Sequence, residues 1–267
     1  MSADDKSKHL RADVYARSSE SMRELEDNSV TLTLTSPPYW SLVDFERADR
    51  GQHRQACWQN TYTRDYATYR GYLAAMQRIF AEVLRVTKPG GHLTLQVASM
   101  QRGGRVYPIP MDLTKRLVDL GFAYREHIFW HKTRNTDHRA GVTIQNPYPG
   151  YYYPGLVGEH LLIFRKPGPR LFEGVDARVK VQAKFPISTL FTVDVLKAVW
   201  HIPINPPGSV NHPTVFPEEL CHRVIALWSY PGDLVLDPFC GSGQTTKVAH
   251  AMGRACVGYE IEPGFAA

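Results

Sequence analysis

The sequence contains few cysteines and no recognisable metal-binding motif. Its four cysteines lie far apart and form no Cys-x-x-Cys pair, which argues against a disulfide framework and against a zinc finger. None of the eleven histidines belongs to a His-Glu-x-x-His motif, and no histidine spacing fits a zinc site. We therefore expect no disulfide framework and no bound metal.

Long hydrophobic runs are also missing. No apolar segment approaches the roughly 20 residues that a membrane-spanning helix requires, and the polar start MSADDKSKHL lacks the apolar stretch of a secretory signal peptide. Hydrophobic residues make up 43% of the 267 residues and charged residues 21%, which is typical of a chain that buries a core. The sequence thus predicts a soluble cytoplasmic protein without a membrane partner, in one large domain or two small ones.

The surplus of positive charge is modest. Lysine and arginine number 31 against 26 aspartates and glutamates, which gives a formal net charge of +5. Such a surplus suits a protein that binds nucleic acid, yet many basic proteins bind none. Charge alone therefore leaves both interpretations open.

Hydrophobic periodicity predicts strands that alternate with helices. This order is typical of an α/β sheet with helices on both faces. An irregular region rich in proline, glycine and aromatic residues interrupts it at 133–215. The expected strands span 30–35, 92–98, 124–131, 161–164, 234–237 and 255–260, and the expected helices span 69–84, 110–120 and 217–228, with a last helix from the glycine loop at 241–243 through 252.

The segment LVLDPFCGSGQTT at 234–246 reads as a strand, a tight glycine loop and the start of a helix. A phosphate-binding loop would need Gly-Lys-Ser/Thr, but Gln244 follows Gly243, and a dinucleotide fingerprint would need a third glycine where Thr246 stands. Acidic residues do end both neighbouring strands, at Asp237 and Glu260. A carboxylate in the position of Glu260 can accept both hydroxyls of a ribose.

A second motif, Thr-Ser-Pro-Pro-Tyr-Trp, follows the strand at 30–35 directly. Its two prolines fix the backbone and remove two donors, which leaves rigid carbonyl acceptors beside the Ser36 hydroxyl. We expect Tyr39 and Trp40 to add exposed ring faces. Such a turn suits the exocyclic amine of a flat heterocycle, although a rigid turn with its aromatic residues packed inward is the alternative.

Together, TSPPYW and VLDPFCGSGQTT resemble the amino-group DNA methyltransferases of the circularly permuted beta arrangement, and the TSPPY members that methylate cytosine N4 in particular. The resemblance implies a Rossmann-like sheet that uses S-adenosyl-L-methionine, with a small irregular target-recognition insertion. It assigns 1–132 to the catalytic half, 133–200 to the insertion with a returning strand near 159–165, and 201–267 to the cofactor-binding half. Because the sequence stops at Ala267, soon after Glu260, we expect the helix that usually follows the last strand in this family to be missing or cut away.

The resemblance also implies roles for individual residues. Asp13, expected at the end of the first short strand, would face the adenine amine of the cofactor, and Glu260 would hold its ribose. The catalytic turn would comprise Ser36, Pro37, Pro38 and Tyr39, and the cofactor pocket Asp13, Pro213, Phe216, Asp237, Pro238, Phe239, Gly241, Gly243, Thr245 and Glu260. Gln244 departs from the threonine that is commoner at its position.

DNA contacts are expected from basic and aromatic residues near the catalytic turn and after the strand at 124–131, where they could bind phosphates beside a displaced base. These residues are Trp40, Arg47, Arg50, Lys132, Arg134 and Arg139. A solvated surface is the alternative for each basic residue. Double-stranded DNA is the expected partner, and a cognate restriction endonuclease is a further candidate.

The predicted reaction is methyl transfer to cytosine N4 by direct in-line attack of a flipped-out base. Methylation of a ring carbon is disfavoured, because that class of enzyme uses a cysteine after a proline and no Pro-Cys pair occurs here. Ser36 favours cytosine over adenine, since family members with Asp or Asn at that position mostly methylate adenine N6. Adenine-N6 or RNA methylation, and a non-catalytic DNA-binding homologue, remain alternatives.

Overall fold

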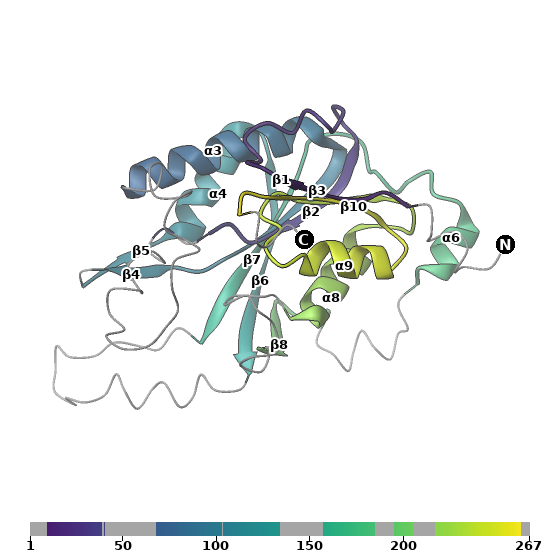
Figure 1. Cartoon of the computed structure of the whole chain (residues 1–267). Coiled ribbons are helices and arrows are strands. Elements are labelled where there is room, and N and C mark those ends of the chain that lie inside the picture. The colour runs from purple at the N-terminus through teal and green to yellow at the C-terminus, as the bar shows by residue number, and fades with distance from the viewer. Residues whose placement is uncertain are drawn as a thin grey trace.

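A computed structural model describes residues 10–38, 40, 68–102, 104–133, 157–184, 195–204 and 217–262. Its main feature is an eight-stranded sheet, with a separate two-stranded hairpin (Figure 1). The sheet contains, from one edge to the other, β1 (Ala12–Ala16), β10 (Ala255–Glu260), β9 (Leu234–Asp237), β2 (Val30–Thr35), β3 (Thr87–Val97), β7 (Gly158–Arg165), β6 (Ala123–Thr133) and β8 (Val199–Pro203), and the hairpin β4 (Met100–Arg102) and β5 (Arg105–Tyr107).

Within this sheet, β7 runs antiparallel to both of its neighbours, and the other neighbouring pairs are parallel. The carboxyl ends of β1, β10, β9, β2 and β3 therefore meet at one edge. In open α/β sheets, ligands bind at that edge. The motifs at 35–40 and 237–246 both start there.

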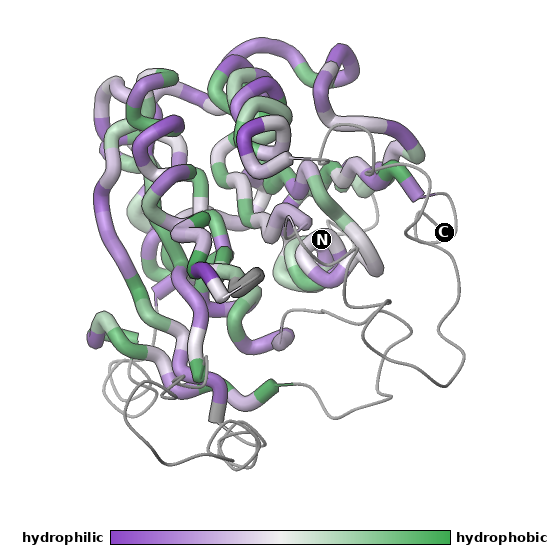
Figure 2. Tube along the Cα trace, turned by 90° about the vertical axis from the view of Figure 1, so that its left-hand side faces the viewer, coloured by the Kyte–Doolittle hydropathy of each residue, from purple (hydrophilic) through white to green (hydrophobic). Residues whose placement is uncertain are grey.

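Helices cover both faces of the sheet (Figure 1). One face packs against α3 (Tyr69–Val86) and α4 (Ile109–Leu120), and the other against α8 (Glu218–Trp228) and α9 (Gln244–Ala251). Hydrophilic and hydrophobic residues alternate along the turns of the helices, as amphipathic helices require (Figure 2). A short helix, α6 (Ala177–Gln182), has no buried residue. No described helix has the length and hydrophobicity of a membrane-spanning segment.

Strand β2 lies in the middle of the sheet, and all six of its residues are buried. The alternation of valine and leucine with threonine predicts this strand correctly. The threonine side chains are nonetheless buried, and two of their hydroxyls donate hydrogen bonds to carboxylates. Thr31 Oγ1 donates to Asp233 Oδ1 at 3.0 Å, and Thr35 Oγ1 donates to Asp237 Oδ1 at 2.6 Å.

Strand β3 begins five residues earlier than the expected strand at 92–98. Residues 88–91 lie inside the strand, because a register shift after the Val30–Thr87 pair accommodates them as a bulge. Gly90 has φ +83°, and its N–H donates to Lys166 O at 2.9 Å. A Cβ at Gly90 would lie 2.1 Å from Pro169 O, so the close approach of that segment requires glycine.

The described parts of the region 133–215 are more regular than the sequence suggests. They include α6, β7 and β8, and β8 pairs in parallel with β6. Exposed and buried residues alternate along β8, and Trp200 and Ile202 are the buried ones. This period-two signal in VWHIP is short and ends in proline, so sequence reasoning missed the strand. The hairpin β4–β5 was also not predicted.

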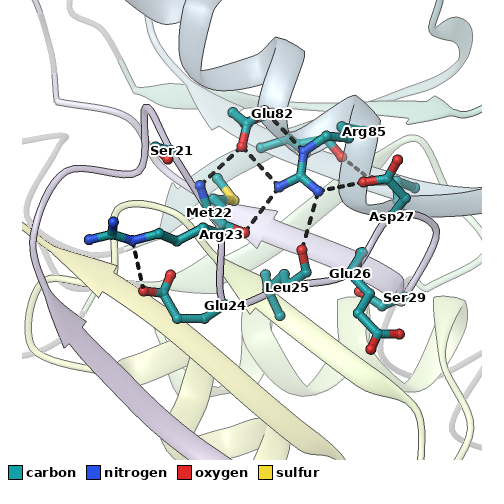
Figure 3. A network of polar contacts seen from close by, with 12 residues as sticks. Ser21, Met22, Arg23, Glu24, Leu25, Glu26, Asp27, Ser29, Glu82 and Arg85 are labelled. Atoms are coloured by element: carbon teal, nitrogen blue, oxygen red, sulfur yellow. Dashed lines mark hydrogen bonds and ion pairs between the residues drawn. The ribbon is translucent and has the colours of Figure 1, made fainter.

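The loop between β1 and β2 is fixed to α3 by a polar network (Figure 3). The Arg85 guanidinium donates to Met22 O at 3.0 Å and Leu25 O at 3.2 Å, and it pairs with Asp27 at 2.6 Å. Glu82 accepts the Met22 N–H at 3.0 Å. The hydrogen bonds from Arg85 lower the pKa of Glu82. The network therefore sets the position from which β2 starts.

Candidate active site

The two sequence motifs meet on adjacent strands at the carboxyl edge. Strand β9 pairs with β2 through Leu32–Val235 and Thr33–Leu236. The hydrogen bond from Thr35 to Asp237 then joins residues that lie 202 positions apart in the sequence. Sequence reasoning predicted Asp237 as a site residue and included Thr35 in the motif without giving it a role in the site. A polar residue at the end of a strand buried on both faces was the signal that could have identified it.

Asp237 is the most deeply enclosed acidic group of the site, with 2% of its surface exposed. Its Oδ1 accepts the Thr35 hydroxyl at 2.6 Å and the Phe239 N–H at 3.1 Å. Burial raises the pKa of Asp237 to about 6, although hydrogen bonds from Thr35, Thr245 and Phe239 act in the opposite direction. The buried carboxylate thus accepts hydrogen bonds from both motifs.

This raised pKa predicts a pH-dependent stability difference between the wild type and Asp237→Asn. Unfolding returns the carboxyl to a pKa of about 4, so the folded state holds the proton more tightly. The contribution of Asp237 to the free energy of unfolding is greatest below the unfolded-state pKa and is lost as pH rises through the folded-state pKa of about 6. We expect the wild type to lose on the order of 2–3 kcal/mol relative to the variant between pH 4 and 7. Urea unfolding of both proteins at several pH values between 4 and 7 measures this loss. A stability difference that does not change with pH would contradict the prediction.

The loop after β9 turns on two glycines in the left-handed region, Gly241 at φ +53° and Gly243 at φ +79°. Gly243 is the N-cap of α9 and supplies no side-chain cap. The first N–H groups of α9 therefore face the loop, where a helix N-terminus favours a negatively charged group. The predicted residues Pro238 and Thr245 are buried beside this loop, and Phe239 is partly exposed.

Glu260 ends β10 beside the glycine loop, with 6% of its surface exposed. Its Oε2 accepts the Gly241 N–H at 2.7 Å, and its Oε1 accepts the Glu262 N–H at 2.8 Å. Burial raises the pKa of Glu260. Each carboxylate oxygen can accept more than one hydrogen bond, so this arrangement orients the group and leaves acceptor capacity for two hydroxyls.

Cys240 packs beneath the loop. A Cβ added to Gly258 of β10 would lie 2.5 Å from Cys240 Sγ, so only glycine at this position leaves room for the thiol. Burial raises the pKa of the Cys240 thiol well above its ordinary value. A thiol held in this protonated form is a poor nucleophile, in agreement with the absence of a Pro-Cys motif.

The proline turn leaves β2 with Ser36 and Pro38 partly exposed and Pro37 buried. The expectation that Trp40 offers an exposed ring is wrong, since only 6% of its surface is accessible. Its ring lies 5.2 Å from that of Tyr69 and 4.5 Å from that of Tyr107, between centroids. Trp40 therefore anchors the end of the turn to α3 and β5, and a direct contact with DNA is not supported by its position.

Asp13 does not lie at the end of its strand, which corrects its expected position. It is the second residue of β1, and the strand continues for three residues to Ala16, which pairs with Glu260. The Asp13 carboxylate bonds to Arg11 Nε at 2.7 Å and to the Tyr15 hydroxyl at 3.3 Å. In the sheet it lies level with Val257 and Leu236, one position before Asp237 and three before the end of β1.

Among the residues predicted to bind DNA, Lys132 is described and forms an ion pair with Glu159. Its ammonium group also lies 5.2 Å from the centre of the Trp130 ring. The predicted phosphate contact therefore has to compete with Glu159. Seven further predicted site residues lie outside the described residues: Tyr39, Arg47, Arg50, Arg134, Arg139, Pro213 and Phe216.

Comparison with known proteins identifies what this arrangement resembles. A family model described as DNA methylase, with N6 and N4 methyltransferases as its scope, matches residues 30–267. The type II methyltransferase M.MthZI of Methanothermobacter thermautotrophicus is 28% identical over 268 residues, covering 94% of this chain and 73% of that protein. The type II methyltransferase M.MjaI of Methanocaldococcus jannaschii is 28% identical over 274 residues, covering 90% of this chain and 84% of that protein.

The fold is also shared with a solved structure. TTHA0409, a provisionally assigned DNA modification methylase from Thermus thermophilus solved with S-adenosyl-L-methionine, superimposes with a TM-score of 0.72 at 27% identity. The match covers 95% of this chain and 89% of that one. It confirms the predicted α/β methyltransferase sheet.

Proposed function

This chain belongs to the family of amino-group DNA methylases, and we propose that it methylates N4 of cytosine. Its cofactor is S-adenosyl-L-methionine, and it modifies an exocyclic amine of DNA. The observation that carries the proposal is the 2.6 Å hydrogen bond between Thr35 and Asp237, which places the Ser-Pro-Pro turn beside the glycine loop. Ser36 in that turn favours cytosine, in line with the resemblance to TSPPY members.

The residues around the glycine loop fit the cofactor. The buried Glu260 carboxylate suits the two ribose hydroxyls, and the uncapped start of α9 suits the carboxylate at the methionine end. We propose that the pocket comprises Asp237, Pro238, Phe239, Gly241, Gly243, Thr245 and Glu260. Pro213 and Phe216, outside the described residues, remain predicted members, whereas Asp13, which lies inside β1 and is paired with Arg11, is left out of the proposed pocket.

When bound, S-adenosyl-L-methionine supplies a methyl group activated on a positively charged sulfur. The amine of cytosine is a weak nucleophile because its lone pair is delocalised into the ring. In our proposal the Ser36 hydroxyl and a carbonyl of Pro37 or Pro38 accept its two N–H groups and favour a tetrahedral nitrogen. Positioning and fixed dipoles then provide the catalysis, without a covalent enzyme intermediate.

The target base has to leave the double helix to reach this turn, since the amine is inaccessible in a stacked pair. We propose that segments of 133–200 around β7 read the target sequence, while β7 itself belongs to the sheet. A circularly permuted motif order is also part of the proposal. It is supported by the order of the sheet, in which the C-terminal strands β9 and β10 lie between β1 and β2.

Nucleoside analysis tests the function. The protein is incubated with double-stranded DNA and S-adenosyl-L-methionine carrying an isotopically labelled methyl group, and the DNA is digested and examined by mass spectrometry. We expect the label in N4-methylcytosine. Label in N6-methyladenine would overturn the choice of base but not the reaction type. Cofactor binding without labelled nucleosides, across DNA of varied sequence, would support a non-catalytic DNA-binding protein.

A further inference from the structure

We propose that Thr35 is a positioning residue that holds the catalytic turn in register with the cofactor loop. This inference rests on the proposed function, because it assigns Thr35 a role in aligning the amine with the methyl donor. Thr35 is fully buried and immediately precedes Ser36. Its hydroxyl donates to Asp237 Oδ1 at 2.6 Å, on the neighbouring strand.

The hydrogen bond continues the connection between the two strands to the edge of the sheet. The β2–β9 ladder pairs Leu32 with Val235 and Thr33 with Leu236. Thr35 lies two residues beyond Thr33, where the chain is about to enter the proline turn. At this point a side chain, rather than the backbone ladder, ties β2 to β9.

The acceptor atom is shared with the cofactor loop. Asp237 Oδ1 also accepts the Phe239 N–H at 3.1 Å, so one oxygen contacts the residue before Ser36 and the first turn of the loop. Both Thr35 and Asp237 are almost inaccessible to water. Hydrogen bonds to a carboxylate in such surroundings are stronger than those between neutral groups at the surface.

The relative position of turn and loop fixes the distance between the two reacting atoms. A displacement of about 1 Å in such a geometry can reduce a rate by about 100-fold. The proposed cofactor contacts of Glu260 and the start of α9 do not involve Thr35. Loss of the Thr35 hydroxyl should therefore affect the chemical step more than cofactor affinity.

The test compares Thr35→Val with Thr35→Ser and Thr33→Val. Valine keeps the branched shape of threonine without the hydroxyl, and serine retains the hydroxyl. Thr33 is the matched control, because it lies on the same face of β2, is equally buried, and its hydroxyl has no hydrogen-bond partner in the described structure. Single-turnover methylation rates and the Kd for S-adenosyl-L-methionine are measured for each protein.

Thr35→Val is expected to lower the methylation rate by about 10- to 100-fold, with a Kd within about threefold of the wild type. Thr35→Ser should recover most of the rate, and Thr33→Val should match the wild type. A wild-type rate in Thr35→Val, an equal loss in Thr33→Val, no recovery by serine, or a loss confined to cofactor binding would each overturn the proposal.

Hydrogen exchange separates this inference from the proposed function, because it needs no turnover. The Phe239 amide should exchange about tenfold faster or more in Thr35→Val without added cofactor or DNA, since its acceptor, Asp237 Oδ1, loses the hydrogen bond from Thr35. The same amide should be unaffected in Thr33→Val. Unchanged exchange in Thr35→Val would overturn the coupling even if the enzyme is active, whereas a wild type that methylates no base would overturn only the function.

Discussion

Replacement of Ser36 by aspartate is expected to lower the rate of cytosine methylation by about 100-fold or more. A hydroxyl can both donate and accept a hydrogen bond, whereas an ionised carboxylate only accepts. The ring nitrogen next to the cytosine amine is itself an acceptor and would face the new negative charge. Ser36 is only partly exposed and adjoins the buried Asp237 region, so water would screen that charge poorly.

Two further variants give this experiment its controls. Ser36→Ala removes the hydroxyl without adding charge, and we expect a smaller loss than with aspartate. Ser29→Ala makes the same change at the opposite end of β2, where the Ser29 hydroxyl donates to Glu26 O at 2.7 Å. That variant should retain the wild-type rate, measured as N4-methylcytosine formed per enzyme. Wild-type turnover in Ser36→Asp would refute the role assigned to this hydroxyl.

Replacement of Glu260 by alanine should raise the Kd for S-adenosyl-L-methionine by about 100-fold or more, because hydrogen bonds to a charged group contribute roughly 1.5–3 kcal/mol each. Two ribose hydroxyls would lose their acceptor in this variant. The Gly241 N–H would also lose its 2.7 Å partner, which loosens the loop that surrounds the cofactor. Both effects weaken cofactor binding.

Calorimetric titration with the cofactor measures the change. Glu262→Gln is the control, because it alters a nearby carboxylate but keeps the backbone N–H that donates to Glu260 at 2.8 Å. We expect its Kd to stay within about twofold of the wild type, because the partly exposed Glu262 side chain is not among the proposed cofactor contacts. If Glu260→Ala binds the cofactor as tightly as the wild type, the ribose has another partner.

The sequence was most informative where local pattern and burial coincide. Val30–Thr35 and the β9–α9–β10 unit were predicted closely, because alternation, apolar runs and glycine mark their boundaries. The pairing of Asp237 and Glu260 with a glycine loop could also be read directly, since each ends a strand. These signals depend on neighbours within the same segment.

The errors concern residues whose position depends on distant segments. Whether Trp40 points outward depends on Tyr69 and Tyr107, which come from α3 and β5. Asp13 falls short of the sheet edge because pairing with β10 extends β1 to Ala16. The contact between Thr35 and Asp237 was not predicted, because it requires the order of strands in the sheet.

The position of β9 and β10 has a consequence for synthesis of the protein. Strand β1 joins the rest of the sheet only through β9 and β10, which come much later in the sequence and insert between β1 and β2. While the ribosome is still producing residues before 234, β1 lacks its one partner among the described strands and β2 presents an open edge. Contacts of such long sequence separation form slowly, and unpaired edges promote aggregation. The nascent chain therefore exposes these unpaired edges until β9 and β10 have emerged.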